Sequence, residues 1–304
     1  MSSIEQVETM DDSTVSQRIG LVAGAGRYPL VVAEALLEQG HEVYCIGVKD
    51  HADPKLSNLC TDYIQCGMGR LGAGIRYFRQ NHICRATMAG KIQKVSLFKP
   101  HYWLNLFPDW RGFCTFYPHF ISRKKNRCDD TLLGAVVEAY AKGGISFVPA
   151  TFFVPEILVK LGQICGRRLS GSQRQDIEFG WRMAKELGRI DVGQCVVVKG
   201  RAVLALEAIE GTDLCVSRAG DLCPSGGFTV IKVAKPQQDM RFDVPTIGTQ
   251  TIKIMAEAGG AVLAIEADKT ILIDKDEVIR LANQHKIAIV AIEDAMQGGF
   301  RKAA

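Results

Sequence analysis

The segment FTVIKVAKPQQDMRFDVPTIG, residues 228–248, carries the strongest structural and chemical signals in this chain. Residues 228–234 are rich in β-branched side chains and predict a strand, and a helix candidate follows from Gly248. Between them, Pro236 and Pro245 remove backbone donors and fix φ, which disfavours a strand interior. The sequence therefore predicts a shaped loop between a strand and a helix.

This loop places charged side chains beside strongly apolar sequence. Its carboxylates are Asp239 and Asp243, and its basic groups include Lys235 and Arg241. Charges left near a core usually need an ionic partner, a metal or a bound anion. Two interpretations stay open: a solvated loop held by salt bridges, and a functional site.

Length and composition indicate a protein of ordinary globular type. The 304 residues exceed one small core and favour two domains. A hydrophobic content of 47% and a charged content of 23% are typical of soluble domains. The net charge of +4 is too mild to indicate a nucleic-acid-binding face, so no nucleic-acid partner is expected.

The N-terminal residues, the lengths of the apolar runs and the cysteines indicate the cellular compartment of the protein. The first residues are polar and acidic, without the apolar centre of a signal peptide, and no apolar run is long enough to cross a bilayer. The ten cysteines are scattered and form no CxxC pair. They are expected to be reduced thiols of a cytoplasmic protein, and neither a disulfide framework nor a zinc site.

Short apolar strands alternate with helices in the first half of the chain. Residues 1–17 are expected to form a disordered tail, and residues 18–162 an N-terminal Rossmann-like domain with a parallel sheet. In IGLVAGAGRYPL, residues 19–30, a strand runs into Gly24-Ala25-Gly26 and then a helix. That turn either binds phosphate or is only a tight strand-to-helix connection, because the third glycine of a GxGxxG pattern is Pro29 here.

An aromatic and basic insert at residues 97–127 interrupts this alternation. It interleaves residues such as Trp103, Trp110 and Phe113 with Lys99, Arg111 and other basic side chains. Such a mixture suits an anionic membrane surface or acyl chains near a phosphate. Packing on the sheet, a dimer contact and single-stranded nucleic acid are the alternatives.

The second half, residues 163–304, predicts an α+β domain with a mixed sheet. Residues 171–190 have helical spacing, and residues 194–208 predict two strands joined by a hairpin at Lys199-Gly200. The strand ends carry a polar group that loops could bring near Asp243, and Thr212-Asp213 alternatively caps the next helix. Oxygen ligands without a His or Cys cluster favour Mg²⁺ over zinc. The members of that polar group are Gln194, Glu207, Glu210 and Asp213.

Several blocks together resemble the LpxI type of UDP-2,3-diacylglucosamine pyrophosphatase. The resemblance covers nearly the whole chain from about Arg18. The blocks are LVAGAGRYPL (21–30), DPKL (53–56), RIDVGQCVVV (189–198), VLALEAIEGTD (203–213), RAG (218–220), VAKPQQDMRFDVPTIG (233–248) and EAGGAVLAIEADKTILID (257–274).

The resemblance implies two α/β domains and hydrolysis of the pyrophosphate of UDP-2,3-diacylglucosamine to 2,3-diacylglucosamine 1-phosphate and UMP, in lipid A biosynthesis. It implies Mg²⁺ dependence and attack by water on the phosphorus of the glucosamine side. The C-terminal domain is expected to be catalytic. We also expect a homodimer that binds peripherally to the inner face of the cytoplasmic membrane.

Residues are assigned by matching motifs. The expected catalytic residues are Asp243, Asp213, Gln194 and Thr212, with Asp243 and Asp213 also as metal ligands. The expected substrate-binding residues do not come from matched motifs: Lys235 and Arg241 are proposed to neutralise phosphate oxygens, and the others are Gly24, Gly26 and Thr246. Two rival classes stay open: a non-catalytic nucleotide-sugar or lipid-binding protein, and an NAD(P)-dependent oxidoreductase that uses Gly24 to Gly26.

Overall fold

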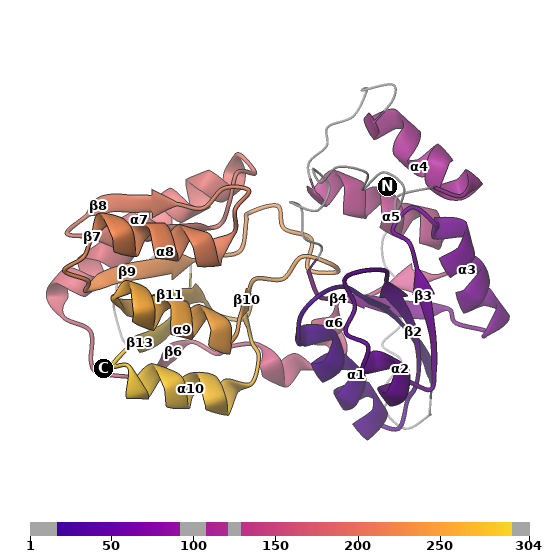
Figure 1. Ribbon diagram of the computed structural model, residues 1–304, viewed down its shortest axis with the longest axis horizontal. Coiled ribbons are helices and arrows are strands. Elements are labelled where there is room, and N and C mark those ends of the chain that lie inside the picture. Colours follow the sequence, from indigo (N-terminus) through magenta and orange to yellow (C-terminus); the bar gives the residue numbers. More distant parts are fainter. Residues whose placement is uncertain (1–16, 92–107, 121–128, 294–304) are drawn as a thin grey trace, which may run out of the picture.

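The computed structural model describes residues 17–91, 108–120 and 129–293 (Figure 1). The expected tail and most of the 97–127 insert lie outside the described residues. In the N-terminal half the elements are β1 Arg18–Ala23, α1 Tyr28–Glu38, β2 Glu42–Val48, α2 Leu56–Leu59, β3 Asp62–Cys66, α3 Leu71–Gln80, β4 Arg85–Ala89, α4 Trp110–Phe120, α5 Asp129–Ala141, β5 Ser146–Phe147, α6 Ala150–Phe153 and a 3₁₀ turn at Pro155–Ile157.

The N-terminal elements form a five-stranded parallel sheet in the order β3-β2-β1-β4-β5. Alternate side chains of each strand point to opposite faces. Ile19 and Leu21 of β1 pack under α1 with Leu36, while Ile46 of β2 packs with Phe78 of α3 on the other face. The strand order reverses beside β1, between β1 and β4, which is where open α/β sheets commonly bind ligands.

The C-terminal elements form a second, mixed sheet in the order β6-β13-β11-β9-β7-β8, with parallel strands β9, β11 and β13 at its centre. Helix α7 covers one face, and α8, α9 and α10 cover the other (Figure 1). The elements are β6 Gly162–Cys165, α7 Gly171–Arg189, β7 Cys195–Lys199, β8 Ala202–Leu206, α8 Thr212–Leu222, β9 Phe228–Lys232, β10 Thr246–Ile247, α9 Thr249–Ala258, β11 Gly260–Glu266, β12 Ile271–Leu272, α10 Lys275–Gln284 and β13 Ala288–Ile292.

A segment of the C-terminal half packs into a core of the N-terminal domain. Ile271 and Ile273, in and beside β12, belong to the apolar cluster under α1. Strand β12 pairs with β10 in a separate two-stranded sheet, and Arg27 at the start of α1 forms an ion pair with Asp274 at 3.2 Å. The domains are therefore joined by apolar packing as well as by the chain.

The fold class is confirmed: the chain is α/β, with a parallel sheet in the N-terminal half and a mixed sheet in the C-terminal half. The hairpin expected at Lys199-Gly200 joins β7 to β8, and Gly200 and Arg201 both have φ of +60°, as a tight two-residue turn requires. The apolar run at residues 270–275 forms only the short β12, because it pairs with β10 outside the main sheet.

Candidate active site between the two domains

The Gly24-Ala25-Gly26 turn lies at the carboxyl end of β1 and is paired with the end of β4. The Gly24 amide donates to the Ala89 carbonyl at 2.8 Å, and Ala25 and Lys91 exchange two backbone hydrogen bonds of 2.8 and 2.9 Å. A side chain on Gly90 would meet the Gly24 carbonyl carbon at 2.8 Å, so the two segments touch backbone to backbone. The turn thereby fixes Lys91 at the edge of the sheet where the strand order reverses.

Gly24 and Gly26 are both expected to bind substrate, but they differ in their hydrogen bonding and in the space around them. The Gly24 amide is already used, because it donates to the Ala89 carbonyl at the end of β4. Gly26 has φ of +99°, and a Cβ added there would meet nothing within 4 Å among the described residues, so its backbone borders open space.

On the C-terminal side, Glu207 ties two of the expected catalytic residues together. Glu207 directly follows β8 and is buried. It accepts a hydrogen bond from the Thr212 hydroxyl at 3.0 Å and one from the Gln194 backbone amide at 3.2 Å. The buried side-chain Oε1 of Gln194 has no hydrogen-bond partner within the described part of the chain. A buried carbonyl oxygen without a hydrogen-bond partner can accept a hydrogen bond from a donor group of a ligand.

Asp243 lies at the domain boundary because its two neighbours are anchored there. Phe242 packs against the N-terminal cluster around α3 and α5, and Val244 packs against the cluster under α1. The Asp243 amide donates to the Asp239 carbonyl at 3.0 Å, which closes a turn of the loop. The loop after β9 thus leaves its own domain and is held by the other one (Figure 1).

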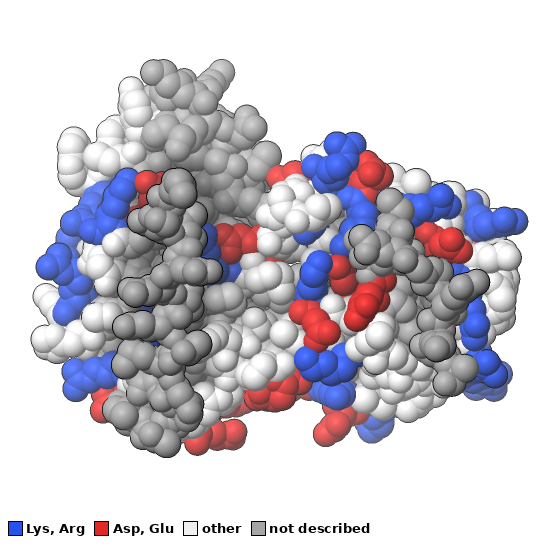
Figure 2. Space-filling model, turned by 180° about the vertical axis from the view of Figure 1, so that it is seen from behind, with Lys and Arg blue, Asp and Glu red and all other residues white. Residues whose placement is uncertain are grey.

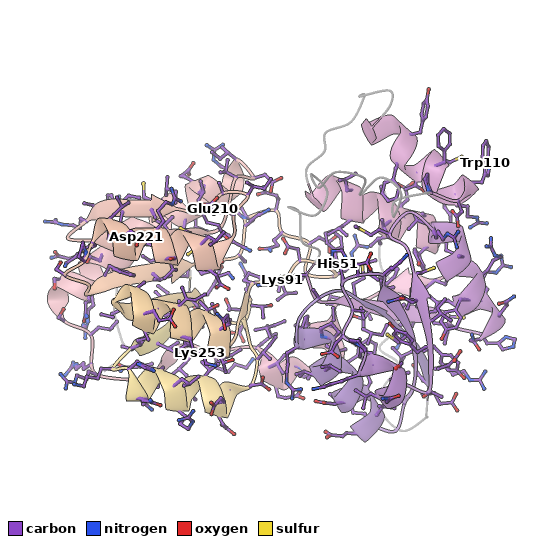
Figure 3. All side chains as sticks on the ribbon, viewed as in Figure 1. His51, Lys91, Trp110, Glu210, Asp221 and Lys253 are labelled. Carbon is purple, nitrogen blue, oxygen red and sulfur yellow. The ribbon has the colours of Figure 1, made fainter. Side chains whose placement is uncertain are left out.

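Lys91 lies between the two domains (Figure 3) and is solvent-exposed. Repulsion from Lys232 is the largest cause of a lowered pKa at Lys91, followed by partial burial of its ammonium group. Asp213, Glu207 and Asp243 act in the opposite direction and raise that pKa. Side chains of both signs also lie next to one another along the domain boundary in Figure 2. The electrostatic neighbours of Lys91 are thus residues of the C-terminal half, including the expected Asp213 and Asp243.

The remaining expected residues have local partners. The Lys235 ammonium pairs with Asp191, and Arg241 forms a bidentate pair with Asp239. Hydrogen bonding to Arg241 lowers the pKa of Asp239. The Thr246 carbonyl accepts from the buried Lys232 ammonium at 3.0 Å, so Thr246 is joined to this charge cluster through its backbone.

The donors available for Mg²⁺ are carboxylates. No cluster of three or more His, Cys, Asp or Glu in residues 17–91, 108–120 and 129–293 is arranged to hold a metal by itself. Asp213, in the first turn of α8, accepts from the Thr251 hydroxyl at 3.1 Å. Magnesium is commonly held by one or two carboxylates together with substrate phosphates and water. Asp213 and Asp243 fit such a substrate-completed site and do not form a protein-only cage.

Sequence reasoning misses the roles of Lys91 and Lys232 in this cluster. By sequence, Lys91 groups with the basic insert that follows it, and Lys232 is only part of a strand. A signal is present, because each lysine ends a short apolar strand segment: ICRATMAGK at 83–91 and FTVIK at 228–232.

The fold and this charge cluster define a two-domain α/β protein with polar groups of both sheets meeting at the domain boundary. A family model described as the LpxI N-terminal domain matches residues 18–157, and one described as the LpxI C-terminal domain matches residues 160–290. Together they span most of the chain, which belongs to the LpxI family.

A curated relative and a solved structure are similar to this chain. "UDP-2,3-diacylglucosamine pyrophosphatase LpxI" of Caulobacter vibrioides is 28% identical over 284 residues, which are 91% of this chain and 98% of the relative. The UDP-glucose 4-epimerase of Thermus thermophilus, solved in complex with NAD, is 11% identical to this chain, and the match covers 91% of this chain and 86% of the epimerase chain. Its TM-score of 0.32 is too low to support any argument from that likeness.

Proposed function

We propose that this protein is a hydrolase that cleaves the pyrophosphate bond of UDP-2,3-diacylglucosamine, releasing UMP and 2,3-diacylglucosamine 1-phosphate for lipid A biosynthesis. Membership of the LpxI family and the activity named for the Caulobacter relative support this function. The structural observation that carries it is that Lys91, at the carboxyl end of the N-terminal sheet, lies near enough to Lys232, Asp213, Glu207 and Asp243 of the other half for their charges to shift its pKa. Carboxylates and ammonium groups together suit a metal-bound pyrophosphate.

In the proposed reaction, a water oxygen forms a bond to phosphorus on the glucosamine side while the bond from that phosphorus to the bridging oxygen breaks. The bridging oxygen leaves with UMP. Asp243 holds or orients the attacking water. Both Asp243 and Asp213 would hold Mg²⁺, with Asp213 on the side of the ion that faces the substrate. When bound, Mg²⁺ offsets the pyrophosphate charge and lowers the pKa of water.

Other residues position the substrate. The Oε1 atom of Gln194, which is unpartnered among the described residues, accepts a substrate donor. The Glu207 carboxylate fixes Thr212 and the Gln194 backbone beside it. Lys235 and Arg241 remain candidate phosphate ligands, and each would exchange its pairing with a neighbouring carboxylate for the substrate. Gly24, Gly26 and Thr246 contribute backbone at the domain boundary.

The decisive assay is UMP release from UDP-2,3-diacylglucosamine with added Mg²⁺. Asp243→Ala is expected to reduce kcat at least about a hundredfold, and Asp221→Ala, which changes an exposed carboxylate of α8, serves as the matched control. Removal of Mg²⁺ by EDTA should abolish turnover and its return should restore it. Full activity of Asp243→Ala would remove this residue from the chemistry. Turnover in ¹⁸O-labelled water identifies which product carries the label.

The same assay separates the rival classes. A non-catalytic binding protein retains the UDP-lipid without releasing UMP. An NAD(P)-dependent oxidoreductase binds a nicotinamide cofactor without binding the lipid. The Gly24 and Ala25 amides already donate to the carbonyls of Ala89 and Lys91, which disfavours that cofactor because a dinucleotide-binding turn presents free amides to the pyrophosphate.

Peripheral binding to the inner face of the cytoplasmic membrane is part of the proposal, and an exposed aromatic row on α4 supports it. Trp110, Phe113 and Tyr117 are 78%, 38% and 44% exposed, and successive rings lie 6.0 and 5.5 Å apart. Trp110 points away from the N-terminal domain (Figure 3). Aromatic side chains favour the membrane interface. No helix within the described ranges is long and apolar enough to span a bilayer.

Vesicle binding tests this part of the proposal. Co-sedimentation with anionic vesicles should fall in the variant that replaces all three aromatic residues by Ala, while Phe152→Ala, at another exposed aromatic residue, should leave it unchanged. Equal binding of both variants would contradict the assignment of α4.

We also propose a homodimer. Strand β8 is an edge of the six-stranded sheet, and the exposed apolar residues Leu206, Ile209 and Leu214 lie on and after it. Exposed apolar surface beside a strand at a sheet edge favours association. Light scattering should give twice the monomer mass, and a monomeric mass at micromolar concentration would refute the dimer.

A further inference from the structure

Lys91 is held in place by backbone contacts and not by its side chain. Its amide and carbonyl both pair with Ala25, and Gly90 has φ of +98° and touches the Gly24 turn. An L side chain at position 90 would be strained by this φ and would collide with the Gly24 backbone at 2.8 Å. Two glycines thus serve to place one lysine just beyond β4, at the point where the strand order reverses.

The ammonium group of Lys91 is available to a ligand. Residue Lys91 as a whole is exposed although its ammonium group is partly buried, and within residues 17–91, 108–120 and 129–293 it makes no ion pair, whereas Lys235 and Arg241 are each paired with a carboxylate. Its largest electrostatic interaction is repulsion by Lys232, which is buried at the end of β9. An anion bound by Lys91 near Lys232 relieves that repulsion, and a pyrophosphate supplies two negative charges.

We propose that Lys91 is the N-terminal domain's phosphate-binding residue, donating to a pyrophosphate oxygen from one side, while Lys232 and the carboxylates that would hold Mg²⁺ lie on the other side. This inference rests on the proposed function, because it takes the domain boundary as the substrate site. It makes the substrate a bridge between the two domains, since the nucleotide diphosphate contacts one cation from each sheet. Neither lysine is among the residues assigned above by matching motifs.

Binding of UDP in the presence of Mg²⁺ tests the role without any turnover. UDP carries the pyrophosphate but no acyl chains, so membrane and lipid contacts do not contribute. Calorimetric titration should show Lys91→Ala binding UDP about ten- to a hundredfold more weakly than the wild type, the range for one hydrogen bond to a charged group. Lys91→Arg keeps the charge and should recover part of that loss.

The matched control is Lys49→Ala. Lys49 is an exposed lysine that directly follows β2, on the same edge of the same sheet but away from the reversal point. The Lys49→Ala variant should bind UDP with the same affinity as the wild type. Because both lysines are exposed, neither replacement removes core packing, and circular dichroism should be unchanged in both. Lys91→Ala that binds UDP within about twofold of Lys49→Ala overturns the inference.

The outcomes separate this inference from the proposed function. UMP release by the wild type together with unchanged UDP binding in Lys91→Ala leaves the hydrolase standing and overturns the role of Lys91. Lys91-dependent UDP binding without UMP release in any variant supports the role of Lys91 and refutes the hydrolase. In the expected case, KM for the UDP-lipid rises in Lys91→Ala by the same factor as the UDP dissociation constant.

Discussion

Replacement of Glu207 by Gln tests whether this buried carboxylate organises the C-terminal side of the site. Glu207 accepts one hydrogen bond from the Thr212 hydroxyl and one from the Gln194 amide, at 3.0 and 3.2 Å. The hydroxyl can reverse and accept from the new amide, but the backbone N–H of Gln194 can only donate. Gln at position 207 therefore keeps both hydrogen bonds, but a neutral amide takes the place of the charged carboxylate in each of them.

The expected cost follows from these two bonds. Hydrogen bonds to charged groups contribute about 1.5–3 kcal/mol each and neutral ones about 1 kcal/mol, so replacing two charged bonds by neutral ones in Glu207→Gln should lower the free energy of unfolding by about 1–4 kcal/mol. Glu207→Ala leaves both donors without an acceptor, at about 1–3 kcal/mol each, and should cost about 2–6 kcal/mol.

Urea unfolding followed by circular dichroism measures both free energies, with Glu178→Gln on the exposed face of α7 as the control for loss of a carboxylate. The Gln variant should also lower the rate of UMP release, because the Thr212 hydroxyl reverses its hydrogen bond and the negative charge of Glu207 is lost. The reasoning is refuted if Glu207→Gln and Glu178→Gln unfold at the same urea concentration with the same slope.

Two further substitutions test the backbone and packing at the domain boundary. Gly90→Ala should lower the free energy of unfolding by about 1–3 kcal/mol more than Gly40→Ala, as measured by urea unfolding. Both glycines have positive φ, but only Gly90 has backbone atoms within about 3 Å of an added Cβ. Equal losses in the two variants would mean that the close approach to Gly24 is unimportant. Phe242→Ala removes the packing of the Asp243 loop on the N-terminal domain and should lower kcat/KM about tenfold or more. The exposed Phe152→Ala is its control for stability and rate, and equal kinetics of the two variants would contradict the anchoring role.

The main elements of the fold could be predicted because their signals are local. The periodicity of residues 171–190 predicts α7, and the Lys199-Gly200 turn between two β-branched runs predicts the β7–β8 hairpin. The path of residues 236–247 could not be predicted in this way. Phe242 and Val244 are apolar residues in a charged loop, and only the folded chain shows that their partners are in the other domain.

The candidate site was predictable in part for the same reason. Matching motifs named Asp213 and Asp243, and the negative charges of both raise the pKa of Lys91. The place of Lys91 itself depends on its pairing with Ala25, far earlier in the chain, which no local pattern reveals. Likewise, the charges of Lys235 and Arg241 suggested phosphate contacts, but their pairing with carboxylates is visible only in three dimensions.

The anchoring of Phe242 and Val244 decides which groups travel together if the two halves of the molecule swing apart. Asp243 belongs to the C-terminal half by sequence, yet its neighbours are embedded in the N-terminal one. A hinge motion would carry Asp243 away from Asp213 and Glu207, in company with Lys91. If the two halves separated, the carboxylates would separate with them, so the proposed water-activating arrangement would be complete only in the closed molecule.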